Sequence, residues 1–289
     1  MSNLPSIVCP IDFSEGSRTA LNYAAVIADH FGARLLVMSV DDPLLVSAAQ
    51  SAGLPPLGEE TERELRRFIA QTVPDTSLRA ATLDVQVAAG KPATQILRLA
   101  VERAADLIVM SSHGRSGVSK RFFGSTTERV LRETTIPVLV TPGHATPVAS
   151  VTDISRLVKR VIAPVDLSPA SAHQVKIAQG IASAMGVPLL VAYVLESIYI
   201  PPKLRTAVSG ADQLRRADVE AQLRELADAA ETIVLAGDAS EEIVRLADTR
   251  GAGLIVMGLH SSGPLGPRMG TVTYRVLCLT HAFVLGLPP

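Results

Sequence analysis

The chain has 289 residues, which is enough for two domains that each bury a core of their own. Its composition, 47% hydrophobic and 19% charged, excludes a disordered chain and a coiled coil. A formal net charge of −1 gives no overall electrostatic reason to bind nucleic acid or an anionic membrane. No apolar run approaches the ~18 residues of a membrane-spanning helix. We therefore expect no nucleic-acid and no membrane partner.

The first residues contain neither a basic segment nor a long apolar one, so no signal peptide is predicted and a cytoplasmic location is expected. Cys9 and Cys278 both lie in apolar surroundings and are expected to be buried free thiols.

Short aliphatic runs alternate with amphipathic segments along the first half of the chain, a pattern typical of parallel strands joined by helices. The first helix is predicted to begin after an N-cap at Ser14 and to stop at Gly32. The later predicted helices are 61–73, 92–104 and 126–133. The predicted strands are 7–12, 34–40, 82–87, 106–110 and 136–140.

The second half of the chain repeats the first. Residues 7–40 align with 161–194 at an offset of 154, and 12 of the 34 pairs are identical. Residues 87–113 align with 234–260 at an offset of 147, and 14 of the 27 pairs are identical. The offset then becomes 146, which pairs Gly124 with Gly270. The chain is therefore a duplication.

We expect two homologous domains, residues 1–146 and 155–289, joined by a linker at 142–155. The order of elements predicts an α/β fold in which each domain has a five-stranded parallel sheet with helices on both faces. Residues 197–210 are expected to form a long loop that contains proline. The last strands, 136–140 and 282–285, are expected at sheet edges, where exposed apolar edges invite pairing.

In such a sheet, ligands bind beyond the carboxyl ends of the strands, where the strand order reverses. The candidate residues are Asp12-Phe13-Ser14 after the first strand and the loop 111–125 after the fourth. This loop is rich in Gly and Ser, carries three cations and leads into a helix N-terminus. Glycines allow backbone N–H groups to approach an anion closely, and the helix end adds unpaired donors. The loop thus has the chemistry of a phosphate cradle.

These motifs resemble the universal stress proteins in their tandem, two-domain form. The resemblance covers nearly all of both halves and depends on Pro10-x-Asp12-x-Ser14, Val87-x-x-Gly90, Ile108-Val109-Met110 and the loop. It implies two Rossmann-like domains of the adenine nucleotide alpha hydrolase type. It also implies a stress-response or regulatory protein that binds ATP or another adenine nucleotide, with or without Mg²⁺. In this family the last strands pair between domains, so we expect a pseudo-two-fold pair of domains within the chain and a homodimer.

The resemblance also implies roles for individual residues. Asp12 would contact the ribose or the base, and Val40 would lie beside the adenine. Gly114, Gly117, Gly124 and Ser125 would hold the phosphates, and we expect Arg115 and Thr126 to belong to the same site. The three loop cations, Arg115, Lys120 and Arg121, are equally compatible with phosphate partners and with solvated loop charges. A second, weaker site would comprise Asp166, Val194, Gly258, Gly270 and Thr271.

Both halves depart from the ATP-binding pattern of Gly, two residues, Gly, nine residues, Gly and Ser or Thr. In the first half, Ser111 stands where the first glycine is expected. In the second half, Ser261 replaces the middle glycine, the loop is one residue shorter, and Pro264 and Pro267 remove two backbone donors. The second loop has one fixed cation, Arg268, whereas the first has Arg115, Lys120 and Arg121. The first domain is therefore the better candidate for anion binding.

Several of these residues also have a purely structural interpretation. Asp12 could cap the first helix with Ser14, and Ser125-Thr126-Thr127-Glu128 reads as a capping box. Asp41 and Asp42 are interpreted as turn or capping residues, and His113, which repeats as His260, as a structural histidine. No metal site is predicted, because no second His or Cys stands at ligand spacing.

No catalytic residues are predicted, since the chain lacks a Gly-x-Ser-x-Gly elbow and a Walker lysine. Two alternatives to a nucleotide-binding protein remain open. One is an interaction protein that binds no nucleotide and acts through its dimer surface, and the other is a slow nucleotide hydrolase.

Overall fold

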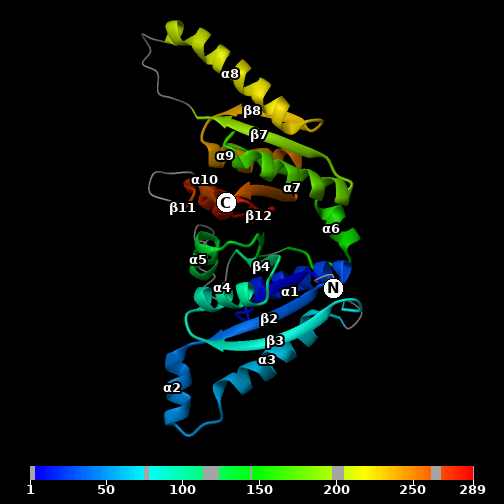
Figure 1. Ribbon diagram of the computed structural model, residues 1–289, viewed down its shortest axis with the longest axis vertical. Coiled ribbons are helices and arrows are strands. Elements are labelled where there is room, and N and C mark those ends of the chain that lie inside the picture. Colours follow the sequence, from blue (N-terminus) through cyan, green and yellow to red (C-terminus); the bar gives the residue numbers. More distant parts are fainter. Residues whose placement is uncertain are drawn as a thin grey trace. The chain divides into compact units, whose positions relative to one another are not determined.

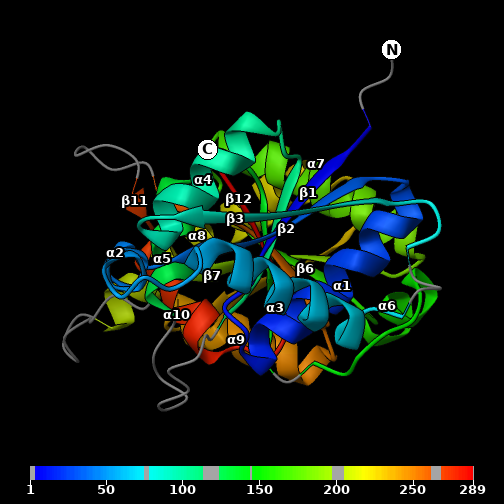
Figure 2. The same ribbon diagram turned by 90° about the horizontal axis from the view of Figure 1, so that it is seen from below.

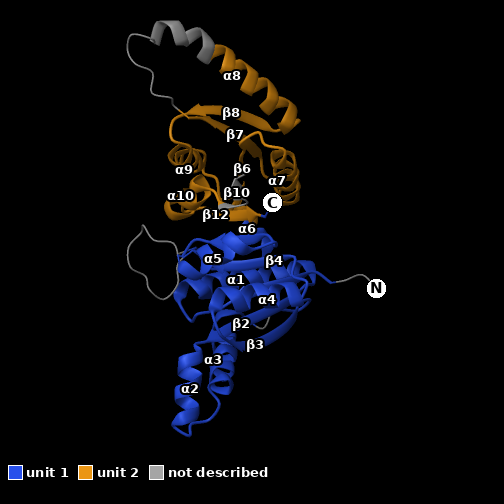
Figure 3. Cartoon of the chain, turned by 60° about the vertical axis from the view of Figure 1, so that its left-hand side comes forward, with its two compact units in different colours: residues 1–154, 288 blue, residues 155–287, 289 orange. Residues whose placement is uncertain are grey.

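The computed structural model describes residues 4–74, 78–112, 124–143, 145–196, 205–261 and 268–288. The chain divides into two compact units, unit 1 at residues 1–154 and unit 2 at residues 155–287 (Figure 3). Of the described helices, none is long and apolar enough to cross a membrane.

Unit 1 alternates strands and helices along the chain (Figure 1). Its strands are β1 (Ser6–Pro10), β2 (Arg34–Asp41), β3 (Thr82–Ala89), β4 (Leu107–Ser111) and β5 (Val138–Thr141). Its helices are α1 (Glu15–Phe31), α2 (Pro43–Ser51), α3 (Leu57–Thr72), α4 (Pro92–Glu102) and α5 (Ser125–Glu133), followed by α6 (Val151–Leu157) at the boundary with unit 2.

The strands of unit 1 form a parallel sheet in the order β3-β2-β1-β4-β5. Helices α1 and α3 pack on one face and α4 and α5 on the other, so that β3 lies between α4 and the pair α1 and α3 in Figure 2. The aliphatic runs of the sequence become strands that are buried on both faces, as predicted.

Unit 2 repeats this arrangement. Its sheet has the parallel order β8-β7-β6-β9-β12. The strands are β6 (Val161–Pro164), β7 (Leu189–Leu195), β8 (Glu231–Ala236), β9 (Leu254–Gly258) and β12 (Phe283–Leu287), and the helices are α7 (Ala170–Met185), α8 (Arg205–Ala227), α9 (Ala239–Arg250) and α10 (Thr271–Leu279). A short antiparallel pair, β10 (His260–Ser261) and β11 (Arg268–Met269), precedes α10. The two-unit α/β fold thus agrees with the sequence prediction.

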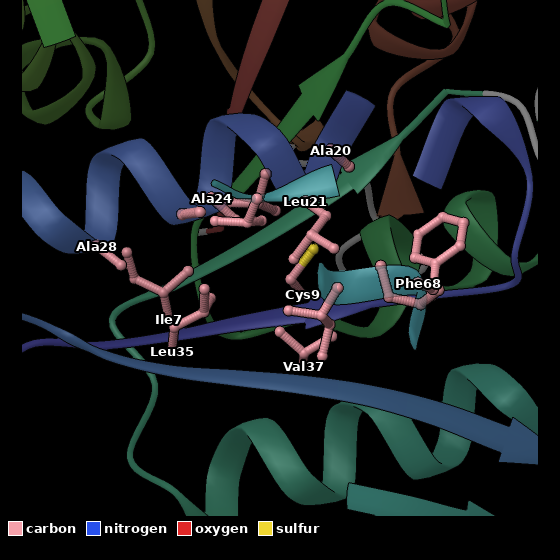
Figure 4. Close-up of a cluster of buried hydrophobic side chains, with 14 of the residues drawn as sticks. Ile7, Cys9, Ala20, Leu21, Ala24, Ala28, Leu35, Val37 and Phe68 are labelled. Atoms are coloured by element: carbon pink, nitrogen blue, oxygen red, sulfur yellow. The ribbon is translucent and has the colours of Figure 1, made fainter. Parts of the chain in front are cut away.

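The core of unit 1 lies between α1, α3 and strands β1 and β2 (Figure 4). The inward face of α1 is largely alanine, which brings the helix close to the sheet, while Leu21 fills the remaining space. Cys9 is fully buried in this cluster, and burial raises the pKa of its thiol far above the ordinary value. Cys278 of unit 2 is only half-buried.

Three details differ from the prediction. The uncharged segment 43–51 forms a helix, α2, capped by Asp42 through a 2.8 Å bond from the Leu44 amide. The predicted loop at 197–210 is wrong in part, because residues 205–210 belong to α8; residues 197–204 lie outside the described part of the chain. The predicted linker contains helix α6, and the segment before that helix is bonded to unit 1.

This segment is held by two side chains of α1. The Asn22 amide donates to the Val148 carbonyl at 3.0 Å, and the Val148 amide donates back to Asn22 at 2.8 Å. The Tyr23 hydroxyl donates to the Thr146 carbonyl at 2.8 Å, and burial raises the pKa of Tyr23 to about 12. One asparagine thus satisfies both backbone groups of a buried residue, as a neighbouring strand would.

Replacement of Asn22 by alanine is expected to lower the free energy of unfolding of unit 1 by about 2–3 kcal/mol, because the buried N–H and C=O groups of Val148 lose their partners. Urea unfolding followed by circular dichroism measures the loss. The equivalent exposed position in unit 2 supplies the control, and Lys176→Ala should change stability by less than about 0.5 kcal/mol. Equal effects of the two substitutions would contradict this account of the segment.

Candidate functional site

The candidate site of unit 1 lies where the winding of the sheet reverses direction. Strand β1 pairs with β2 on one side and with β4 on the other, so the carboxyl ends of the three strands share one edge. The β1–β4 register extends only over Ile7↔Leu107 and Val8↔Ile108. Beyond Val8 and Ile108 the two strands separate, and after Pro10 and Ser111 the chain enters the segments selected from the sequence, which is the position expected for a ligand in this class of fold.

Asp12 occupies a strained turn at this edge. The Asp12 carboxylate accepts hydrogen bonds from the Ser14 amide at 3.1 Å and from the Ser14 hydroxyl at 2.6 Å. Between them, Phe13 has a φ of 64°, a left-handed conformation that is unfavourable for a bulky residue. Ser14 is also the N-cap of α1, as predicted, because its hydroxyl oxygen accepts from the Ser17 amide at 3.1 Å.

The same turn recurs in unit 2. The Asp166 carboxylate accepts from the Ser168 amide at 2.9 Å and from the Ser171 hydroxyl at 3.0 Å, while Leu167 has a φ of 58°. Desolvation raises the pKa of Asp166, but the hydrogen bonds from Ser168 and Ser171 outweigh it and hold the pKa below its ordinary value. Both units thus have a strained backbone at the equivalent residue, Phe13 or Leu167. Such strain persists only where surrounding contacts support it and is common at functional sites, so its recurrence favours a ligand-binding role for this turn.

The side chain of Phe13 connects this turn to the core. Its ring meets that of Phe68 of α3 edge-on, with centroids 5.6 Å apart. The Arg18 guanidinium lies 4.3 Å from the centroid of the Phe68 ring and donates to the Thr72 hydroxyl at 2.8 Å. Packing against α3 therefore offsets the backbone strain at Phe13.

Val40, the residue predicted beside the base, is the penultimate residue of β2 and pairs with Ala88 of β3. It is half-buried, as is Val194 at the same position of β7. The next residue, Asp41, is buried and its carboxylate accepts from the Thr61 hydroxyl at 2.8 Å. Its carbonyl accepts from the Gly90 amide at 3.0 Å. Asp41 thus joins β2 to α3 and to the end of β3, whereas only Asp42 has the capping role predicted for both.

The two ends of the loop after β4 are pinned together. The Gly124 amide donates to the Ser112 carbonyl at 3.0 Å, and the Thr127 hydroxyl donates to the Ser111 carbonyl at 2.9 Å. Gly114, Arg115 and Gly117, which were predicted to contact phosphate, lie outside the described residues. Sequence analysis missed Thr127 as the residue that ties α5 to β4. Its identity with Thr273 in the repeat was the available signal.

The start of α5 differs from the predicted capping box. Gly124 is the N-cap, with a φ of −60°, and within the described part of the chain no side chain caps the helix. Ser125 is therefore the first helical residue and is exposed, with Thr126 half-buried behind it. A helix start with no side-chain cap keeps backbone donors available to an anion, together with the positive end of the helix dipole.

The absence of glycine at Ser111 has no structural cost. Ser111 does not have a positive φ, and neither does its counterpart Gly258. A Cβ atom built on Gly258 would lie 3.8 Å from the nearest atom, which is ordinary contact. The first glycine of the family pattern is therefore not required by the backbone of either unit.

The corresponding edge of unit 2 is bridged by additional bonds. The buried Gln174 amide donates to the Pro164 carbonyl at 2.6 Å and to the Val256 carbonyl at 3.0 Å, across the reversal between β6 and β9. The position equivalent to Gln174 in unit 1 is Ala20. The Gly270 amide donates to the Leu259 carbonyl at 3.1 Å, and the β10–β11 ladder closes the base of the loop. The Gly270 bond has its counterpart in the bond from the Gly124 amide to the Ser112 carbonyl. Unit 2 therefore differs from unit 1 by the Gln174 side chain at the reversal point, where unit 1 has the smaller Ala20, and by the β10–β11 ladder at the base of its loop.

Helix α10 is tied to the start of α9 by ion pairs. Arg275 donates to Asp238, the N-cap of α9, at 2.6 Å, and to Glu241 at 3.2 Å. Hydrogen bonds from Ser240, the Glu241 amide and Arg275 lower the pKa of Asp238 to about 2. Thr271 begins α10 after the N-cap Gly270, which has a φ of −64° and no side-chain cap. The starts of α5 and α10 thus share their backbone geometry, but the ion pairs from Arg275 to α9 are a feature of α10.

Among the described residues, no group of three or more His, Cys, Asp and Glu side chains could hold a metal ion. The site consists instead of one carboxylate turn, the ends of β2 and β4, and the uncapped start of α5.

Comparisons with known proteins place this geometry in a family. The universal stress protein family model matches residues 4–142 and again residues 158–285. Universal stress protein MJ0531 of Methanocaldococcus jannaschii is 30% identical over 143 residues, covering 46% of this chain and 79% of the relative. A universal stress protein of Thermus aquaticus is 32% identical over 136 residues, covering 47% of this chain and 96% of the relative. Each of these relatives matches less than half of the chain.

Solved structures match the whole fold. The functionally unknown protein PA1789 of Pseudomonas aeruginosa aligns with a TM-score of 0.69 at 19% identity, over 99% of this chain and 93% of that chain. A universal stress protein of Archaeoglobus fulgidus aligns with a TM-score of 0.64 at 20% identity, over 99% and 98% of the two chains. These likenesses show the fold, and the two matches of one family model show that the chain belongs to the universal stress protein family, in a tandem form.

Proposed function

We propose that the chain binds ATP or another adenine nucleotide at the carboxyl edge of unit 1 and acts in a stress response or its regulation. The observation that carries the proposal is the meeting of two features at one reversal point. The Asp12 turn lies at the end of β1, and the uncapped start of α5 is tied to the end of β4. A ribose hydroxyl donates well to a carboxylate, and phosphate oxygens accept from helix N–H groups.

Family membership supports adenine as the base, because the ATP-binding branch of the family uses the same edge and a loop pattern that unit 1 matches at Gly114, Gly124 and Ser125, with Ser111 in place of its first glycine. The base would lie beside Val40 and the ribose beside Asp12, with the phosphates near Gly124, Ser125 and Thr126. Gly114, Arg115 and Gly117 belong to the same proposal on the sequence alone. An Mg²⁺ ion carried by the nucleotide would be held mainly by phosphate oxygens and water, as is usual for this ion.

Unit 2 is proposed as the weaker site. Asp166, Val194, Gly258, Gly270 and Thr271 keep the positions of their counterparts, but the Gln174 side chain lies across the reversal point and the β10–β11 ladder engages backbone groups at the base of the loop. The asymmetry expected from charge and donor count is therefore supported by contacts within unit 2.

A matched pair of substitutions tests this asymmetry. Gly124→Val is expected to weaken ATP binding at least about tenfold, which corresponds to about 1.4 kcal/mol, by blocking the approach of phosphate to the backbone. Gly270→Val should change the affinity less than about twofold. Both glycines have a negative φ that valine can adopt, so neither variant should unfold. Calorimetric titration with ATP measures both effects, and equal losses would overturn the asymmetry.

Turnover is expected to be far below the ~10 s⁻¹ typical of enzymes. Phosphoryl transfer needs a positioned nucleophile and stabilisation of the moving phosphoryl group, and no residue described at this edge is an evident base for water. Saturating ATP should raise the melting temperature, because a ligand at 100 times its Kd adds about 2.7 kcal/mol to stability. Phosphate release is the deciding assay. A steady rate of phosphate release of about 1 s⁻¹, abolished in Asp12→Ala while ATP binding persists, would instead establish a hydrolase.

We also propose that two copies of the chain associate, through helix α2. The segment 43–57 contains no charged residue. Leu44 is 79% exposed, and Leu45 and Leu54 are each 62% exposed. An uncharged apolar helix can meet its own copy about a two-fold axis without bringing like charges together. The pairing of units 1 and 2 through their last strands stays a prediction from the family resemblance.

Sedimentation velocity at micromolar concentration is expected to show a dimer that Leu44→Asp converts to monomer, because the carboxylate would be desolvated in the contact. Leu214→Asp, at a comparably exposed leucine of α8, is the control and should leave the dimer intact. A wild-type chain that sediments strictly as a monomer would refute the association.

A further inference from the structure

Unit 2 contains a groove at the amino ends of its strands, whereas the candidate nucleotide site of each unit lies at the carboxyl ends. The groove has a volume of about 660 Å³ and lies between α7, the first residues of β7 and the turn that follows α8. Its floor is aliphatic, formed by Val175, Val187, Leu189 and Leu226. It opens at the amino ends of β7 and β8, since Leu189 and Glu231 are their first residues. A nucleotide at the carboxyl edge would therefore not reach it.

The polar groups of the groove stand on opposite walls. Lys176 and Gln179, one turn apart on α7, supply hydrogen-bond donors, and Asp228 supplies an acceptor on the other side. The Gln179 amide also donates to the Ser183 hydroxyl at 3.1 Å, which leaves its second N–H group for a ligand. Glu231 also lines the groove, but its carboxylate already accepts from Arg160 at 2.6 Å and from Arg250 at 3.1 Å. Donors on one wall, an acceptor on the other and an apolar floor suit a segment of polypeptide main chain with an aliphatic side chain.

Unit 1 shows what fills the equivalent place in the duplicated fold. There the connection from α3 to β3 spans residues 73–81, and its described residues 78–81 contact the end of α1 and the core cluster. Leu78 and Ala81 pack on the core cluster, and the Ala80 amide donates to the Asp29 carboxylate at 2.7 Å. The Ala80 carbonyl lies 3.9 Å from where a Cβ atom of Gly32 would be. The end of α1 is therefore covered by the chain itself.

Unit 2 lacks this cover. The connection from α8 to β8 consists only of residues 228–230, Asp-Ala-Ala. No atom of the described residues lies within 4 Å of a Cβ atom built on Gly186, the counterpart of Gly32. Arg18, which bridges to Phe68 and Thr72 in unit 1, corresponds to Ala172 on the wall of the groove. The shorter connection and the smaller side chain together leave the groove open.

We propose that this groove binds an extended segment of a partner protein that carries a leucine-sized side chain. The aliphatic side chain occupies the floor, and Lys176 and Gln179 donate to carbonyl groups of the bound segment. Asp228 accepts from an N–H group of the segment. In unit 1, Leu78 of the longer connection packs on the core cluster. The proposal is independent of nucleotide binding, because it uses other residues at the other end of the strands.

The chain itself supplies the probe. A fluorescein-labelled peptide with the sequence of residues 73–81, VPDTSLRAA, carries the natural filler of this place. Fluorescence polarisation with the full chain is expected to show saturable binding with a Kd of about 100 µM, as suits a small contact. The same peptide with alanine in place of its leucine should bind at least about fivefold more weakly, because the floor is then left unfilled.

Ala172→Arg restores the unit 1 residue at an exposed position and should lower the affinity at least about tenfold by occupying the groove. Ala184→Arg makes the same change at an exposed position of α7 that does not line the groove, and should have no effect. Circular dichroism establishes that both variants are folded.

Three results would overturn the proposal. The first is an absence of saturation up to about 2 mM peptide, or equal binding of a scrambled peptide. The second is binding of an aliphatic carboxylate such as decanoate, with loss in Ala172→Arg, when the peptide does not bind; this would make the groove a small-molecule site. The third is loss of the dimer in Ala172→Arg alone, which would assign the groove to a second copy of the chain.

Discussion

The reversal of winding at β1 is the constraint on which the candidate site depends. The chain winds from β1 through β2 to β3 in one direction and from β4 to β5 in the other, so the connections after β1 and β4 diverge and the backbone between them lacks a neighbouring strand. Polar groups at that point need partners from turns and side chains. The Asp12-Phe13-Ser14 turn, the Thr127 bond to β4 and the pinned loop ends all supply them.

Comparison of the two units distinguishes features that this fold requires from features that differ between the copies. Both units keep the left-handed residue after the aspartate and the threonine that ties the last helix to its strand. Both also keep a glycine after the third strand, Gly90 or Gly237, with a φ of 142° or 149°. A Cβ atom at either glycine would lie within 3 Å of a side chain on the following helix. Features that persist at two positions in one molecule are those that the architecture needs.

The differences between the units lie where a ligand or partner would bind. Unit 2 places Gln174 across the reversal point and shortens the connection before β8, whereas unit 1 has Ala20 and a long connection that packs on α1. Neither change disturbs the strand order, because each replaces contacts at the ends of strands rather than between them. One copy can therefore lose a function, or gain another, without loss of the fold.

Much of this structure could be predicted from the sequence. Strands such as 107–111 are predicted by their aliphatic runs, and the sequence repeat predicts the same order of strands and helices in both units. Helix α2 was missed because its uncharged residues show no amphipathic period, and its only clear start signal is the Asp42-Pro43 pair. The capping box at Ser125 failed because a tertiary contact, the bond from the Gly124 amide to Ser112, sets the start of α5 one residue earlier. Asp41 failed for a similar reason, since its partner Thr61 is distant in sequence.

The coupling of Phe13 to Phe68 has a consequence for the thermodynamics of recognition. A turn whose side chain belongs to the hydrophobic core cannot rearrange unless α3 also moves, so its conformational entropy is lost when the protein folds and not when a ligand arrives. Any molecule that contacts Asp12 meets a preorganised carboxylate, and the ordering cost of association falls on other parts of the edge. Affinity at this point is thus coupled to the stability of the core behind it.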